Sequence, residues 1–163
     1  YAQYFVLRCA LALTYGYELD ALGSERQLAD TVIRTENQII RLRSLITNCQ
    51  DYLPILGLGP LRACYEADAI WWRRRRDRYM DVFMRQFEER LQSGHEATRR
   101  SILARVLADA RPAHVLSRPE ARSLCLSMVS AGLDNVSLVV DHVLGQFARS
   151  ARGAAMQLRI RRE

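Results

Sequence analysis

The hydrophobic and polar positions of the chain follow a helical period almost from end to end. Residues 4–13 are nearly all apolar and precede Gly16, which favours a buried helix that ends at a left-handed glycine. From about 25 to 46, apolar residues recur at steps of three and four opposite polar ones, which is typical of an amphipathic helix. A long helix from about 61 to 92 and a short one over 102–107 follow. No stretch alternates with a period of two, so the sequence predicts an all-α fold.

The longest helical pattern covers about 118–150 and forms the predicted central helix. Ser117 and Glu120 have the spacing of a capping box at its start. Between 123 and 144 the helix is mostly apolar, with one polar stripe at steps of four and three: Ser123, Ser127, Ser130, Asp134, Ser137 and Asp141. Because a surface helix has a broader polar face, we expect this helix to be buried on most sides. Five or six helices in all would then surround one long core helix.

The composition fits a single helical region over 1–163. A chain of 163 residues can bury roughly 70% of its unfolded surface. All 24 cationic side chains are Arg, and the formal net charge is +6. The four cysteines form no C-x-x-C pair and the three histidines have no metal-ligand spacing, so we expect reduced, mostly buried thiols and no metal site.

Residues 124–144 are the only stretch long enough to span a bilayer. They contain Asp134, Asp141 and His142, and each Asp costs about 2.5–3.5 kcal/mol near the membrane centre. We therefore predict no membrane span in this chain. The sequence begins at Tyr1, without Met and without a basic leader, which indicates an internal fragment of a longer protein.

Gly132 and Asp134 are the unusual residues of the central helix. A glycine inside a helix costs about 1 kcal/mol relative to alanine, so a close neighbour of the backbone is expected at Gly132. Either a ligand or another helix can be that neighbour. A carboxylate in apolar surroundings needs a partner or a raised pKa, and we interpret Asp134 as a functional residue rather than a structural one.

The motif Ala131-Gly132-Leu133-Asp134 resembles the Ala/Gly-Gly-x-Asp/Glu-Thr motif of the cytochrome P-450 superfamily, the haem-thiolate monooxygenases. Residues 51–56, Asp-Tyr-Leu-Pro-Ile-Leu, look like the segment that the family places between the two helices that roof its substrate pocket. Residues 123–134 are especially similar to the fungal branch that hydroxylates phenylacetate and related aromatic acids. The resemblance covers essentially the whole chain and implies part of the P-450 helical domain.

This resemblance implies a role for each residue of the motif. Ala131 and Gly132 would bind the cofactor, haem, by leaving space above it. Asp134 and Asn135 would be catalytic in proton delivery, with Asn135 in the place of the family's Thr. The full-length relative would hydroxylate a small aromatic substrate with dioxygen and electrons from a flavoprotein reductase. It would lie at the endoplasmic reticulum membrane if it carries the usual N-terminal anchor.

The family's E-x-x-R helix and haem-ligand cysteine loop follow the central helix, and this sequence stops before them. The resemblance therefore implies that the chain lacks the axial thiolate and is inactive alone. Three motifs look like parts of the family's haem site. Arg62-Ala63-Cys64 has Pro60 and Glu66 where the ligand loop needs glycines, and Glu96 to Arg99 and Trp72 to Arg76 lie in the wrong chain order. We interpret these as ordinary surface residues.

The segment Arg73–Arg78 supports an alternative function. Its five arginines follow Trp71 and Trp72, and together they could bind phosphates and stack on bases. The chain would then be a stand-alone helical binding module for nucleic acid or an acidic partner. A solvated helix face explains the same pattern more simply, so we expect no nucleic acid partner. An inactive gene product is a third possibility.

Overall fold

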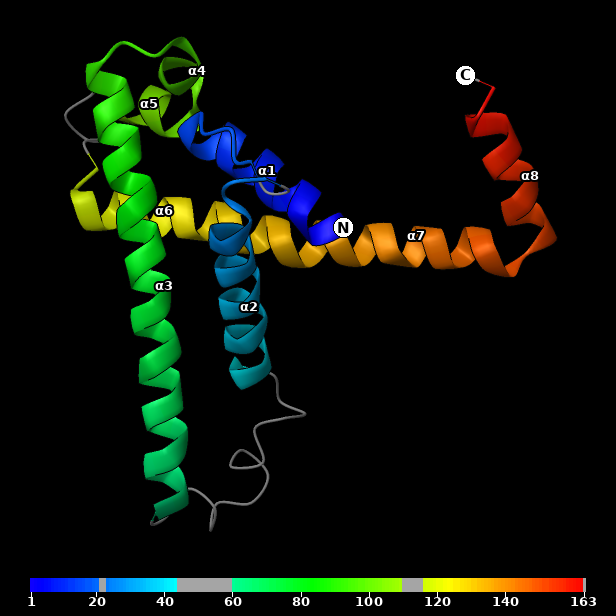
Figure 1. The fold of residues 1–163 in the computed structure, drawn as a ribbon, viewed down its shortest axis with the longest axis horizontal. Coiled ribbons are helices and arrows are strands. Elements are labelled where there is room, and N and C mark those ends of the chain that lie inside the picture. The colour runs from blue at the N-terminus through cyan, green and yellow to red at the C-terminus, as the bar shows by residue number, and fades with distance from the viewer. Residues whose placement is uncertain (21–22, 44–59, 110–115, 163) are drawn as a thin grey trace.

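The computed structural model describes residues 1–20, 23–43, 60–109 and 116–162, and it is helical throughout (Figure 1). The helices are α1 (Ala2–Tyr15), α2 (Arg26–Arg43), α3 (Pro60–Gln92), α4 (Glu96–Arg100), α5 (Ile102–Leu107), α6 (Arg118–Ala131), α7 (Ser137–Arg149) and α8 (Ala151–Ile160), with a π turn, η4 (Gly132–Val136), between α6 and α7. No strand occurs among these residues, which confirms the all-α class. The predicted loop motif at 51–56 lies outside the described ranges.

Helices α6 and α7 and the turn η4 form one continuous rod, as the sequence predicted for about 118–150. Helix α1 crosses this rod at α6 and η4, and α3 crosses it near the start of α6 while running beside α2 (Figure 1). Counting the rod once, the described residues form seven helices, six of them beside the rod, which agrees with the five or six expected to surround it. No separate signal in the sequence predicted α4, because this helix is only five residues long and has no apolar period.

The hydrophobic core lies where α1, α2, α3 and α6 meet. Phe83 of α3 is 1% exposed and is surrounded by aromatic rings. Its ring centroid lies 5.8 Å from Tyr15, 5.8 Å from Tyr17 and 6.0 Å from Tyr79. The rings are tilted or edge-on to one another, the arrangement that aromatic quadrupoles favour. These contacts fix α1 and the chain that follows it against α3.

Two helix ends form as the sequence predicted. Gly16 takes φ 66° after α1, and its amide donates to the carbonyl of Ala12 at 2.9 Å. At the start of α6, the Ser117 amide and hydroxyl donate to the Glu120 carboxylate at 2.8 and 2.7 Å. These hydrogen bonds lower the pKa of Glu120 and satisfy a backbone donor that the helix leaves free.

The expectation that the rod is buried on most sides is wrong for the described residues. Its first half buries Cys125, Val129 and Leu133 in the core. Its second half is open, since Leu138 is 72% exposed and Leu144 is 58% exposed. The reason is geometric: α1 and α3 cover one side of α6, whereas among the described helices α7 is contacted mainly by α1 and by the end helix α8.

By length and composition the rod also meets the requirements for crossing a membrane. A single helix of this kind is weak evidence for a span, because core helices pass the same test. Three of its residues, Cys125, Val129 and Leu133, belong to the protein core, and Asp134 and Asp141 lie along it. That the chain has no span stays our prediction.

The two cysteines with described side chains differ in burial. Cys125 lies in the core, where burial raises the pKa of its thiol. Cys9 is exposed, so the expectation of mostly buried thiols is wrong at this position. The hydropathy around Cys9 indicated a buried helix, yet only one side of α1 faces the core. Within the described ranges, no group of His, Cys, Asp and Glu is arranged to hold a metal ion.

Candidate functional site

The π turn Gly132–Val136 sets the geometry of the candidate site. A π turn widens the helix by one residue and often occurs at functional positions. Ser137 supports it, because its hydroxyl donates to the Leu133 carbonyl and lies 3.3 Å from the Asp134 carbonyl. The polar stripe predicted on one face is therefore divided: Ser127 and Asp141 are exposed, whereas Ser137 is buried. The predicted stripe assumes an uninterrupted α-helical period, and the π turn shifts the residues after it to another face.

Gly132 faces helix α1. A Cβ atom at this position would lie 3.5 Å from the Ala10 side chain and 3.8 Å from that of Val6, which is ordinary van der Waals contact. Of the two neighbours that the sequence left open, a helix or a ligand, the described structure provides the helix. The role of Gly132 above a haem stays a prediction.

Ala131 and Asn135 lie on a different face from Gly132. They are one turn apart, and both are exposed. Leu138 and Val139 follow on α7, at 72% and 61% exposure. The small methyl of Ala131, the amide of Asn135 and these apolar side chains form the open part of the rod around the π turn.

Asp134 lies between the buried and the open faces, and it is half-buried. Burial is the main cause that raises its pKa above the ordinary value of 3.8. The negative charge of Glu36 raises the pKa further, and the positive charge of Arg43 opposes the shift. Of the two alternatives that the sequence left open for Asp134, a partner or a raised pKa, the structure favours the raised pKa, which is caused by burial together with a second acid.

Glu36 is a residue that the sequence analysis missed. It is 2% exposed on α2, and its carboxylate accepts hydrogen bonds from the Tyr79 hydroxyl of α3 and from the Ser130 hydroxyl of α6, the latter at 2.6 Å. Burial and the adjacent carboxylate raise the pKa of Tyr79. The two hydroxyl donors therefore join α2, α3 and α6 around the buried carboxylate of Glu36. One of them, Ser130, lies one helical turn before Asp134.

The Asp134→Asn substitution tests whether the ionised Asp134 carboxylate destabilises the fold. Because the folded-state pKa lies above the unfolded value of 3.8, ionisation of Asp134 weakens the fold as the pH rises through the interval between the two. Below 3.8 the carboxyl is neutral in both states, so the effect vanishes. We expect Asp134→Asn to raise the free energy of unfolding at pH 7 by up to about 1 kcal/mol, and not at pH 3.

Urea unfolding followed by circular dichroism at both pH values measures this difference. Asp141→Asn is the matched control, since Asp141 lies exposed on the same rod. A loss of stability at pH 7, or an equal gain at pH 3 and pH 7, would contradict the assignment.

The arginine run of the alternative function does not form one free surface. The guanidinium of Arg75 lies 5.3 Å from the Trp71 ring centroid and covers part of the indole that would stack on a base. Trp72 meets Trp71 edge-on at 4.4 Å. Arg74 is exposed, whereas Arg76 is half-buried beside α6. The run is split between solvent, an indole and a pocket.

The look-alike motifs take no part in the site. Glu96 pairs with Arg100 at 2.6 Å on the surface, one turn along α4, rather than with the Arg99 of the E-x-x-R spacing. Exposed pairs of this kind contribute little to stability. The side chains of Arg62 and Cys64 lie outside the described part of the structure.

Comparison with curated proteins finds fungal hydroxylases. The chain is 33% identical over 135 residues to 3-hydroxyphenylacetate 6-hydroxylase of Emericella nidulans, covering 82% of this chain and 25% of that protein. It is 32% identical over 136 residues to phenylacetate 2-hydroxylase of the same organism, covering 83% and 25%. To cytochrome P450 monooxygenase CYP3 of Mycosarcoma maydis it is 29% identical over 151 residues, covering 91% and 27%.

The chain thus spans about a quarter of the length of the curated relatives that it matches. No family model and no solved structure matches it.

Proposed function

We propose that this chain, which is similar to cytochrome P450 monooxygenases over most of its length, forms one wall of a monooxygenase site. The observation that supports this most directly is the open face at the π turn, where Ala131 and Asn135 lie one turn apart and exposed. The similarity to the three fungal proteins covers 82–91% of this chain. The wall would face the haem of the complete enzyme.

The residues present fit one side of such a cofactor. Ala131 offers a methyl group and Asn135 an amide on the exposed face, and Leu138 and Val139 extend the face with apolar surface suited to a flat ring system. Haem, when bound, supplies the chemistry on dioxygen. The chain itself contributes the shape of the wall, and we propose that it is inactive alone.

Asp134 would hold and move the proton in this site. Its raised pKa makes the protonated form accessible closer to neutral pH, which a proton donor requires. The buried Glu36, which accepts a hydrogen bond from Ser130, favours the protonated form of Asp134, and Arg43 favours its ionised form. Asn135, next to Asp134, can hydrogen-bond a water molecule through its amide where the family has a hydroxyl.

We further propose a small aromatic acid as the substrate of the complete enzyme. Two of the three relatives are named for hydroxylation of phenylacetate or 3-hydroxyphenylacetate. A flavoprotein reductase would supply the electrons.

A chimera tests the proposed function. The matched segment of 3-hydroxyphenylacetate 6-hydroxylase would be replaced by this chain, and haem incorporation would be read from the reduced carbon monoxide spectrum. We expect a thiolate-type band and hydroxylation of the aromatic acid. In the chimera, Asp134→Asn should lower turnover about 100-fold, the size typical of a lost general acid. Asp141→Asn, exposed on the same rod, should retain it within about twofold.

A haem-loaded chimera in which Asp134→Asn turns over as fast as the parent would contradict the role of Asp134. If the chimera shows no thiolate-type band although circular dichroism indicates a folded protein, the wall assignment itself is wrong.

A further inference from the structure

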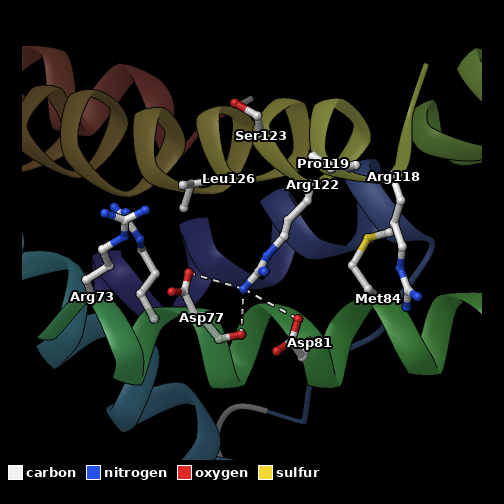
Figure 2. Close-up of a pocket in the computed structure, with 10 residues that line it drawn as sticks. Arg73, Asp77, Asp81, Met84, Arg118, Pro119, Arg122, Ser123 and Leu126 are labelled. Atoms are coloured by element: carbon white, nitrogen blue, oxygen red, sulfur yellow. Dashed lines mark hydrogen bonds and ion pairs between the residues drawn. The ribbon is translucent and has the colours of Figure 1, made fainter. Parts of the chain in front are cut away.

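A cavity of about 340 Å³ lies between α3 and the first half of α6, away from the open face at the π turn (Figure 2). Its volume falls in the range of small-molecule sites, roughly 300–1,000 Å³. Four arginines and two aspartates line it, together with the apolar side chains of Met84, Pro119 and Leu126. The mixture of charged and apolar walls is typical of a site that binds an amphipathic ligand.

Two of the arginines are already paired. Arg122 donates to the carbonyl and the carboxylate of Asp77, at 2.9 and 3.1 Å, and its guanidinium lies 3.4 Å from the carboxylate of Asp81 (Figure 2). Arg118 pairs with Glu88 at 3.2 Å. These bonds hold α6 against α3, and the single charge of Arg122 is shared between the carboxylates of Asp77 and Asp81.

The other two arginines, Arg73 and Arg76, form no ion pair within the described part of the chain. Figure 2 shows Arg73 reaching from α3 toward Leu126 of α6. The Nε of Arg76 is buried without a hydrogen-bond acceptor. Both guanidinium groups line this end of the cavity and their charges are not compensated there by a carboxylate of the described residues, so this end is suited to an anion.

We propose that this cavity binds the carboxylate of a small aromatic acid. The guanidinium groups of Arg73 and Arg76 hold the carboxylate, because planar N–H donors match two carboxylate oxygens. Leu126 and Pro119 of α6 contact the ring of the ligand. The aromatic part of the ligand rests on the proposed function, whereas the anion site rests on the two arginines alone.

Binding of phenylacetate to the 163-residue chain, measured by isothermal titration calorimetry, tests this inference. Phenylacetamide, which lacks the charge, and inorganic phosphate, which lacks the ring, are the comparison ligands. We expect phenylacetate to bind at least tenfold more tightly than either. Arg73→Gln and Arg76→Gln should each weaken phenylacetate binding at least tenfold. Arg74→Gln should leave it unchanged, because Arg74 is exposed on the same helix and does not line the cavity.

Failure of the folded parent chain to bind phenylacetate would overturn the proposal. If phenylacetamide binds as tightly as phenylacetate, the arginines do not hold the carboxylate. If phosphate binds as tightly as phenylacetate, the cavity binds anions in general and not an aromatic acid. Circular dichroism checks that each variant is folded; if Arg76→Gln is not, Arg73→Gln decides, since Arg73 is exposed. The titration needs neither haem nor turnover. An inactive chimera would therefore contradict the proposed function, whereas absent phenylacetate binding would contradict only the proposed cavity site.

Discussion

Replacing Phe83 by alanine is expected to lower the free energy of unfolding by about 3–5 kcal/mol. Phe83 is 1% exposed and its ring contacts those of Tyr15, Tyr17 and Tyr79. The substitution removes a ring from water-excluded surroundings and leaves a cavity that the three tyrosines, fixed on different elements, cannot fill. A loss of this size is a large part of the total stability of a typical domain.

Urea denaturation followed by far-ultraviolet circular dichroism measures the change. Phe5→Ala is the matched control, because Phe5 is 68% exposed on α1. It should change the free energy of unfolding by less than about 0.5 kcal/mol. Similar losses for the two variants would show that the aromatic cluster does not carry the core.

Gly16→Ala is expected to cost about 2–5 kcal/mol, the second largest effect. Two costs add at this position. The residue has φ 66°, where an L side chain is strained by about 1–2 kcal/mol. In addition, a Cβ atom there would lie 2.4 Å from the carbonyl oxygen of Ala97, a contact that forces α1 and α4 apart.

Gly94→Ala separates the two costs. Gly94 has φ 75°, yet no atom lies within 4 Å of the position of its Cβ. Its substitution should therefore cost only the backbone strain, about 1–2 kcal/mol. Equal losses of stability for Gly16→Ala and Gly94→Ala would mean that the end of α1 is not held against α4.

The ends of helices could be predicted from the sequence where nearby residues determine them. Gly16 and the capping box at Ser117 act within one or two turns, and both appear in the structure. The exposure of α7 was not predictable, because it depends on which elements reach that part of the rod. An apolar composition is compatible with burial, but only the tertiary arrangement provides a covering helix.

The candidate site was predictable in composition and less so in arrangement. The sequence singled out Asp134 and predicted a partner or a raised pKa for its carboxyl. It also placed Ala131 and Gly132 together, whereas they lie on separate faces. Glu36 had a usable signal: it is four residues after Val32, on the buried stripe of α2, where a carboxylate requires donors. The donors themselves, on α3 and α6, are distant in sequence.

The π turn has one more consequence, which concerns the phase between the two halves of the rod. One additional residue in a turn rotates everything after it by about 100° relative to an uninterrupted α-helix. Contacts with α1 and α3 fix the rotation of α6 about its axis, and the π turn then determines which face of α7 points outward. Which side chains α7 presents, among them Leu138 and Val139, is therefore determined by a single residue of helical offset.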